Sequence, residues 1–322
     1  MPKSNGYLPR SPQRSMTHPA LKLAIVIPTI GRHAELRRML GSLAAQTCLP
    51  DEILIIDQDQ STRAVADDFP QLKIHVMALP GSAASKRNAG FRAMSPDIEL
   101  VGFMDDDIEL EPDAINALLE FWERAPEDLG GVGCNLVNHP SIVAPRLKGL
   151  RLTSWLGLYD STKGAVLRSG IHTMIGCVND HCYVRWLSSM AAVFPRPLLD
   201  EFMFDEWFQT YSYLEDLDFT YRIGKRYRLA VVADARVYHY PSAVGRPSAY
   251  LFGKKEVLNR LYFVSKYHEL SRPLCCLALC IRSLMSVVLG AMRFKADYFQ
   301  RAAGNLSGAL WAMNRGWKAA RR

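Results

Sequence analysis

The sequence predicts an α/β fold, in which a mostly parallel sheet is flanked by helices, with a helical appendage at the C-terminus. Short apolar runs alternate with stretches of helical periodicity from Leu21 onward. Such alternation along a chain is typical of a parallel sheet that is covered on both faces. Polar residues gather where the apolar runs end, and beyond Pro247 only long helical patterns remain. The first of these two observations places a ligand site at the carboxyl ends of the strands.

The first half of the chain is expected to supply four strands and four helices. The strands are expected at Leu21–Ile27, Glu52–Ile56, Leu72–Met77 and Leu100–Met104. The helices are expected at His33–Gln46, Arg63–Asp68, Ala83–Met94 and Pro112–Arg124. In the first of these helices Leu36, Met39, Leu40 and Leu43 recur at a spacing of three or four, as an amphipathic helix requires.

The second half is less regular. A strand is expected at Trp186–Phe194, a helix at Leu214–Arg226, and two short strands at Leu229–Ala233 and Arg236–Tyr240. These patterns divide the chain into a disordered lead-in over residues 1–20, an α/β domain over 21–247 and a basic helical segment over 248–322. The lead-in has no apolar core, so it does not have the pattern of a secretory signal.

The charge of the chain is unevenly distributed. The net charge is +7, but 13 Lys/Arg and three acidic residues follow Gly253, so the tail is strongly basic and the remainder is slightly acidic. This pattern predicts a basic end that faces an anionic membrane surface, and no nucleic-acid partner. The seven cysteines show no metal-site spacing, which favours a reduced, cytoplasmic setting.

Three adjacent carboxylates form the strongest motif of the sequence. Asp105, Asp106 and Asp107 come directly after the apolar run Leu100–Met104. Their mutual repulsion is relieved if a cation lies among them, and oxygen ligands suit Mn²⁺ or Mg²⁺. The alternative is a solvated acidic turn that precedes a helix.

A second acidic pair and one histidine extend the candidate site. Glu215 and Asp216 open a predicted helix and lie off its apolar stripe, where one of them could act as a general base. Acidic residues in a first helical turn are also favoured by the helix dipole alone. His239 is a candidate metal ligand, although a lone histidine is more often a core or surface residue.

Polar segments follow each of the first three strands. They are Pro28–Arg32, Asp57–Asp59 and Gly81–Gly90, and the last offers backbone amides and two cations to a diphosphate. None has a phosphate-binding Gly-Lys-Ser/Thr ending or a Gly-x-Gly-x-x-Gly pattern, which excludes an ordinary ATPase and a dinucleotide dehydrogenase.

The order of these motifs resembles that of family 2 glycosyltransferases of the inverting, bacterial polysaccharide type, which have the Rossmann-like GT-A fold. The resemblance runs from Lys22 to Pro241. It rests on five segments in order, with Phe204-Asp205-Glu206 before the last: Ile27–Arg32, Ile56-Asp57, Lys86–Gly90, Met104–Asp107 and Glu215–Asp218.

The resemblance implies a role for each matching residue. Nucleotide-sugar contacts would come from these residues: Pro28, Thr29, Arg32, Asp57, Asp59, Arg87, Asn88, Asp105 and Asp106. Asp107 would hold the divalent metal, with Asp105 and His239 as further ligands. Asp216 would be the catalytic base, with Glu215 as the second candidate. The chain departs from the family at Asp57-Gln58-Asp59, where many members have two adjacent acids, so Asp59 would replace the second acid.

The apolar stretch Pro273–Met292 is interrupted by Arg282 and has basic residues on both sides. It is long enough to span a bilayer, but a central arginine and basic flanks favour helices that lie in the membrane interface. Soluble packing or dimerisation is the remaining interpretation. A position at the inner face of the cell membrane would suit a glycan or lipid-linked acceptor.

Two other functions are consistent with parts of the pattern. A sugar nucleotidyltransferase uses a similar sheet, but a Gly-rich basic loop is expected after its first strand, and Pro28–Arg32 does not fit that pattern. A catalytically inactive scaffold in a membrane-bound glycan assembly complex would be expected to lack Asp107 or Asp216, and both are present.

Overall fold

The computed structural model describes residues 21–139, 159–209 and 211–315. The chain forms two compact units. The first comprises residues up to 142 together with 175–206 and 216–244, and the second comprises 143–174, 207–215 and 245–322. The lead-in expected over residues 1–20 lies outside the described residues.

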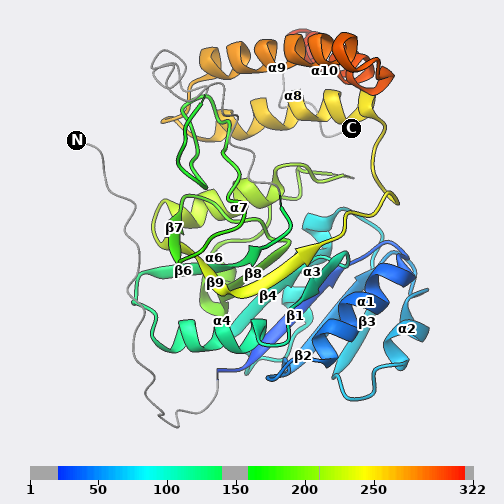
Figure 1. The fold of residues 1–322 in the computed structure, drawn as a ribbon, viewed down its shortest axis with the longest axis vertical. Coiled ribbons are helices and arrows are strands. Elements are labelled where there is room, and N and C mark those ends of the chain that lie inside the picture. Colours follow the sequence, from blue (N-terminus) through cyan, green and yellow to red (C-terminus); the bar gives the residue numbers. More distant parts are fainter. Residues whose placement is uncertain (1–20, 140–158, 210, 316–322) are drawn as a thin grey trace. The chain divides into compact units, whose positions relative to one another are not determined.

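The first unit is built on a mixed sheet with the strand order β3-β2-β1-β4-β8-β6-β9-β5, and β7 pairs with β9 (Figure 1). The strands are β1 Leu23–Pro28, β2 Glu52–Asp57, β3 Ile74–Ala78, β4 Leu100–Met104, β5 Ile108–Leu110, β6 Leu129–Leu136, β7 Cys182–Val184, β8 Ala191–Pro195 and β9 Arg228–His239. Strands β1 to β4 pair in parallel, whereas β8 lies antiparallel to both β4 and β6. The polar segments singled out in the sequence follow strands of this parallel half.

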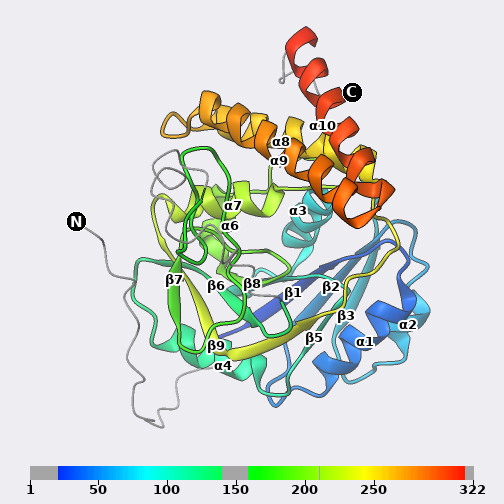
Figure 2. The same ribbon diagram turned by 45° about the horizontal axis from the view of Figure 1, so that its top comes forward.

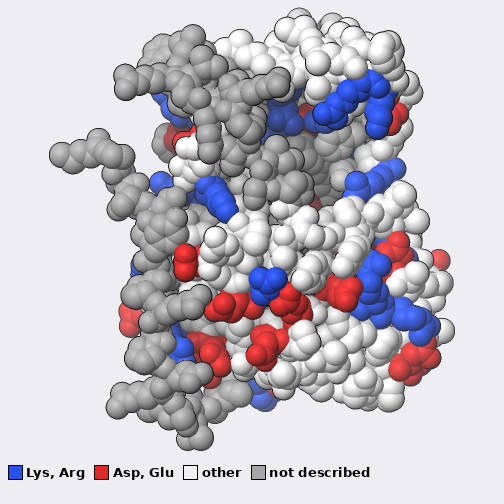
Figure 3. Space-filling model, viewed as in Figure 1, with Lys and Arg blue, Asp and Glu red and all other residues white. Residues whose placement is uncertain are grey.

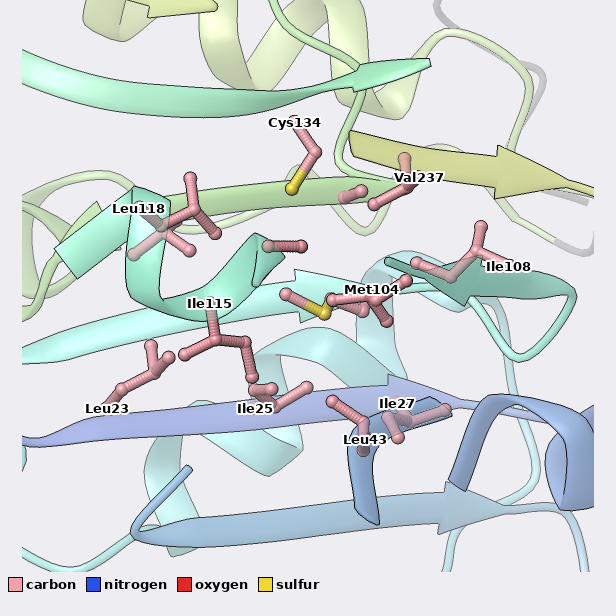
Figure 4. Packing of buried hydrophobic residues seen from close by; sticks show 14 of the residues in the cluster. Leu23, Ile25, Ile27, Leu43, Met104, Ile108, Ile115, Leu118, Cys134 and Val237 are labelled. Carbon is pink, nitrogen blue, oxygen red and sulfur yellow. The ribbon is translucent and has the colours of Figure 1, made fainter. Parts of the chain in front are cut away.

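Helices cover both faces of this sheet. One face packs on α1 His33–Ala44, α2 Arg63–Asp67 and α4 Ala114–Glu123, and the other packs on α3 Ala83–Ala93, α6 Arg196–Glu201 and α7 Glu215–Gly224. Alternate residues of β1 serve the two cores, because side chains alternate across a strand. Ile25 and Ile27 lie in the core that Figure 4 shows, and Ala24 and Val26 lie in the other.

The sequence predictions for the first four strands and the first four helices are confirmed within two residues at each end. The fourth strand matches in full, at Leu100–Met104. All six residues of β1 and of β2 are buried. A strand that is buried on both faces reads as a continuous apolar run, which is why these strands were recognisable.

Two predictions for the later strands differ from the structure, and the strands β5, β6 and β7 were not predicted. The two short strands form one strand, β9, in which a register shift beside Asp234 accommodates the polar residue that seemed to separate them. Strand β8 begins at Ala191, five residues after the expected start. Strand β6 was missed because its sequence contains three glycines, which are poor strand formers. A Cβ at Gly131 would come within 2.7 Å of the Phe194 ring, so the core requires glycine there.

The strand register places the candidate residues. Parallel pairing of β1 with β2 and β4 aligns the carboxyl ends of these strands. Asp57 is the last residue of β2, and Thr29 and Asp105 directly follow β1 and β4. Antiparallel pairing of β5 with β9 sets Ile108 opposite His239. The sheet thus gathers residues from four separate parts of the sequence at one edge.

The second unit contains the helices α8 Ala249–Lys266, α9 Arg272–Arg293 and α10 Ala296–Arg315, whose courses Figure 2 shows from a second angle. Glycines bring α8 and α10 together: a Cβ at Gly304 would lie 2.0 Å from the Tyr250 carbonyl oxygen, and one at Gly253 would lie 2.2 Å from that of Arg301. Such an approach of two helix backbones is possible only where no side chain stands between them.

Candidate active site

The three aspartates that follow β4 point to three different sets of partners. Asp105 pairs with Arg87, Asp106 with Thr29 and Arg32, and Asp107 with His239. The Asp105 amide donates to the Met190 carbonyl, which fixes the backbone at the end of the strand. The acidic turn is therefore not a solvated loop, because cationic or hydroxyl groups hold each carboxylate.

Asp107 and His239 form the pair that could hold a metal. The distance between Asp107 Oδ1 and His239 Nε2 is 3.3 Å, and the Ser242 amide donates to Asp107 Oδ2 at 3.2 Å. Burial alone would raise the pKa of Asp107, but the hydrogen bond and charge of His239 together with the Ser242 amide and Arg32 lower it. The carboxylate is consequently ionised at neutral pH, as a metal ligand must be.

The described residues contain no group of three or more His, Cys, Asp or Glu side chains gathered as a metal site. Mg²⁺ is usually bound by one or two carboxylates, with substrate phosphates and water supplying the other positions. One carboxylate and one imidazole therefore fit a divalent ion whose coordination a diphosphate completes. Asp105, the other predicted ligand, is held by Arg87 at 2.6 Å in this structure.

Asp106 is buried beneath the site. Its carboxylate accepts from Thr29 Oγ1 at 2.6 Å and from Arg32 Nη1 at 2.9 Å. Burial raises its pKa to about 6, against the opposing effects of Arg32 and Thr29. Arg32 also lies 3.6 Å from Asp107 and donates to the Val244 carbonyl, so one guanidinium bridges two acidic residues and the chain beyond β9.

A second group of charges surrounds Asp216 at the start of α7. Burial raises the pKa of Asp216, and the Leu217 amide, Arg87 and Ser188 partly oppose that rise. Asp105 acts on the same carboxyl as a like charge, so Asp216, Asp105 and Arg87 lie within electrostatic reach of one another. A carboxyl with a raised pKa that remains partly exposed is suited to accept a proton.

Glu215, the second candidate for the base, is buried, and its amide donates to the Ser212 carbonyl. The preceding residue, Leu214, has a φ of +78°, in the region that L-residues rarely adopt. A strained backbone directly before an acidic pair is a common feature of functional sites. The side chains of the two acidic residues therefore have different surroundings, although they are adjacent in sequence.

Asp57 organises the turn after β2. Its two carboxylate oxygens accept from the amides of Gly31, Gln58 and Thr62 and from the hydroxyl of Ser61. Burial alone would raise the pKa of Asp57, but these hydrogen bonds outweigh that effect and lower it. Gly31 has a φ of +74°, which allows its amide to reach Asp57. Asp59 is exposed and accepts from the Ser61 amide.

Two residues of the Lys86–Gly90 segment are held by protein groups. The Asn88 side chain donates to the Phe204 carbonyl and accepts from the Phe204 amide, and it also reaches Glu206 at 2.8 Å. Lys86 is buried and donates to the Thr29 carbonyl at 2.5 Å, so its ammonium supports the end of β1 from inside. The sequence pointed to this segment but gave no indication that Asn88 holds the backbone at Phe204.

Ser242 and Ser188 complete the site and were missed from the sequence. Ser242 supports Asp107, and Ser188 supports Asp216. Single serines in loops carry no pattern. Only the position of Ser242, three residues after His239, could have indicated its part.

The sequence of residues 24–178 matches the family described as glycosyl transferase family 2. The galactofuranosyltransferase GlfT2 of Mycobacterium tuberculosis is 32% identical over 148 residues, which cover 41% of this chain and 22% of that protein. An uncharacterised glycosyltransferase of Haemophilus influenzae is 32% identical over 122 residues, which cover 37% of this chain and 38% of that protein. The chain thus matches well under half the length of these relatives.

Solved structures share the fold at low sequence identity. TarS of S. aureus in complex with UDP-GlcNAc has a TM-score of 0.55 at 16% identity, covering 93% of this chain and 84% of that chain. The mannosyltransferase PcManGT from Pyrobaculum calidifontis in complex with GDP-Man and Mn²⁺ has a TM-score of 0.54 at 15% identity, covering 91% and 87%. The predicted GT-A type of α/β fold is therefore confirmed.

Proposed function

We propose that this protein, whose residues 24–178 match glycosyl transferase family 2, transfers a sugar from a nucleotide-diphosphate sugar to an acceptor hydroxyl with inversion at the anomeric carbon. One observation carries the proposal. The Asp107–His239 pair, which could hold a metal, lies at the acidic turn after β4, and so do the charges that surround Asp216, the candidate base. Residues at a single turn could therefore stabilise the leaving diphosphate and activate the attacking hydroxyl.

The donor end of the site would lie over Asp107. When bound there, Mn²⁺ or Mg²⁺ would neutralise charge on the departing diphosphate. Asp107 and His239 would hold the ion, and Arg32, which lies 3.6 Å from Asp107, would provide a further positive charge near the phosphates. GDP-Man with Mn²⁺ in PcManGT is consistent with such a donor class.

The Arg87–Asp105 pair would position the donor sugar. Arg87 Nη2 and Asp105 Oδ1 are 2.6 Å apart, and Arg87 is buried against the Phe204 ring. Because the Phe204 ring holds the Arg87 guanidinium in place, the Asp105 carboxylate is held in one orientation. Its exposed part could then accept hydrogen bonds from sugar hydroxyls.

Asp216 would take the proton of the acceptor hydroxyl as that oxygen attacks the anomeric carbon. The Leu217 amide donates to Asp216 Oδ1 at 2.7 Å, which orients the carboxylate that would accept the proton. Holding both substrates in line removes much of the entropic barrier. Inversion follows from a single displacement, and no covalent sugar intermediate on the protein is needed.

The acceptor would be a glycan or lipid-linked glycan in the assembly of a cell-surface polysaccharide, at the inner face of the membrane. The basic excess of the C-terminal segment supports this location.

Turnover of nucleotide sugars tests the proposal. Purified protein is incubated with a panel of uridine, thymidine and guanosine diphosphate sugars, with Mn²⁺, with Mg²⁺ or with EDTA. We expect one donor to be hydrolysed slowly or transferred, with no reaction in EDTA. Calorimetry with the same panel covers the case of a missing acceptor. If no donor binds in the presence of metal, the proposal fails and the inactive scaffold becomes the better explanation.

A further inference from the structure

Helix α9 exposes most of its large apolar residues and buries mainly small ones. Most of its buried residues are small: Cys275, Ala278, Leu279, Ser286 and Gly290. Seven of its large apolar residues are exposed, and we call them the outer stripe of α9: Leu277, Ile281, Leu284, Met285, Val287, Val288 and Met292. A helix of a water-soluble bundle turns its large apolar residues inward. The outer stripe therefore faces something other than bulk water.

Further large apolar residues are exposed beyond α9. Phe294 is 94% exposed, and α10 contributes Leu306, Leu310 and Met313, which are also exposed. Figure 3 shows the edge of the unit over α9 and α10 as mostly uncharged, with a cluster of Lys and Arg side chains beside it. Exposed apolar areas of this extent mark interaction sites.

The central arginine of α9 binds within the unit. Arg282 donates to Glu256 Oε1 at 2.9 Å, and Glu256 is 1% exposed. Arg301 and Asn305 of α10 bind the same carboxylate. This network links α8, α9 and α10 through one buried anion and fixes the rotation of α9 about its axis. Although α9 is long and apolar enough to cross a membrane by length and composition, its central arginine already has a partner within the unit.

The ends of the outer stripe are basic. Arg272 precedes it and Arg293 and Lys295 follow it, and all three are exposed. The sequence contains no acidic residue between Glu269 and Asp297. A surface that is apolar along its length and cationic at both ends complements a bilayer with anionic headgroups. If two copies of this chain met through their outer stripes, neither stripe would supply an acidic residue to pair with these cations.

We propose that the outer stripe of α9, with Phe294 and the exposed apolar residues of α10, docks on the surface of an anionic lipid bilayer, with α9 lying in the plane of the membrane. This inference gives a physical basis to the membrane-bound acceptor of the proposed function. It can be tested without any turnover, so failure of one does not imply failure of the other.

Vesicle sedimentation is the first test. The full chain is mixed with vesicles of phosphatidylcholine alone or of phosphatidylcholine with phosphatidylglycerol. We expect binding to the anionic vesicles and about fivefold weaker binding for each of Arg293→Gln and Lys295→Gln. Leu284→Glu and Val288→Glu should each weaken binding about tenfold or more, because each places a charge in the apolar contact.

Leu49→Glu is the matched control. Leu49 is an exposed leucine of the first unit, 42% exposed against 64% for Leu284. The same substitution there should leave vesicle binding unchanged. Donor binding by calorimetry should be equal in all of these variants, which shows that the active site is intact.

Two exposed cysteines of α9, Cys276 and Cys280, can report whether this helix is covered by a membrane. A water-soluble maleimide should label both in solution, and anionic vesicles should protect both, while labelling of Cys48 is unchanged. Absence of vesicle binding by the unaltered chain, or equal binding by Leu284→Glu, overturns the proposal. So does a dimer that Leu284→Glu dissociates without any vesicle binding, or a membrane fraction that resists alkaline carbonate, which would indicate a spanning helix.

Discussion

The Nε2 atom of His239 lies 3.3 Å from Oδ1 of Asp107. The two residues are far apart in sequence, and the antiparallel pairing of β5 with β9 joins them by setting Ile108 opposite His239. Asp107 directly precedes β5 and His239 ends β9, so this strand pair fixes the positions of both residues. The sheet itself thus provides the part of the site that would hold a metal.

The first prediction concerns Asp107→Asn. An amide of the same size is a much weaker metal ligand, and it leaves Arg32 with Asp106 as its only carboxylate at this site. We expect turnover to fall by about three orders of magnitude, because a bound metal supplies several kcal/mol of transition-state stabilisation. Metal-dependent donor binding, measured by calorimetry, should fall as well.

Asp128→Asn is the control for that experiment. Asp128 is an exposed aspartate that pairs with Arg228 at the surface, and exposed pairs contribute little to stability. This variant should keep full turnover. Normal metal-dependent binding and turnover in Asp107→Asn would contradict the assignment of Asp107 as a ligand.

The second prediction separates the two acidic residues at the start of α7. Asp216→Asn should abolish turnover while donor binding stays within about twofold, because it removes only the proton acceptor. Glu215→Gln should keep most of the activity. The reverse result would make Glu215 the base. Steady-state rates and calorimetric affinities for both variants decide between them.

The same carboxyl has a defined pH dependence. Burial raises the pKa of Asp216, so turnover should increase as the pH rises through that pKa and the base loses its proton. A carboxyl with a raised pKa in the folded state favours folding at a pH below its unfolded value, and that contribution is lost as the pH rises through the folded pKa. Asp216→Asn should therefore be more stable than the unaltered chain at neutral pH, as thermal unfolding can measure.

Strands β1, β2 and β4 could be predicted from the sequence because they are fully buried and therefore appear as apolar runs. The acidic turn after β4 and the acidic pair at α7 were also recognisable, since clustered carboxylates are rare unless a cation or a proton compensates them. The glycine-rich β6 was not recognisable, because its glycines are selected by neighbours such as Phe194, which are distant in sequence.

The detailed roles of the site residues depend on contacts that a sequence does not contain. Asn88 is placed by the motif order near the donor, but its side chain is satisfied by the backbone of Phe204. Arg282 interrupts an apolar stretch, and only the structure reveals its buried partner Glu256. In both cases the deciding partner lies on another element, so local pattern alone could not supply it.

The third prediction concerns that buried anion. Burial alone would raise the pKa of Glu256, but the hydrogen bonds from Arg301 and Asn305 and the charges of Arg282 and Arg301 lower it to about 2. A lowered pKa contributes stability above the unfolded value, near pH 4.5, and that stability is lost as the pH falls toward 2. The shift corresponds to about 3 kcal/mol.

Glu256→Gln should therefore lower the stability of the chain by about 3 kcal/mol at neutral pH, because two arginines lose their shared buried counter-ion. Its stability should also depend less on pH between about 4.5 and 2 than that of the unaltered chain. Unfolding by urea at a series of pH values measures both effects. Parallel pH profiles for the two proteins would exclude a role for Glu256 in acid sensitivity.

The fourth prediction compares two glycines that lie within helices. A Cβ at Gly304 of α10 would lie 2.0 Å from the carbonyl oxygen of Tyr250, whereas a Cβ at Gly41 of α1 would meet nothing within 4 Å. Gly304→Ala should force α8 and α10 apart and destabilise the protein by about 1–3 kcal/mol. Gly41→Ala should instead stabilise it by about 0.5–1 kcal/mol, because alanine loses less backbone entropy in a helix.

Chemical denaturation of both variants tests this contrast. Helix propensity alone predicts that both alanines stabilise, so the opposite signs isolate the contribution of the close α8–α10 approach. Because α10 also supplies Arg301 and Asn305 to Glu256, Gly304→Ala should weaken that network too. Its destabilisation and that of Glu256→Gln should then be less than additive in the double variant, since both substitutions disturb the same helix contact. Full additivity would show that the glycine contact and the buried anion stabilise the unit independently.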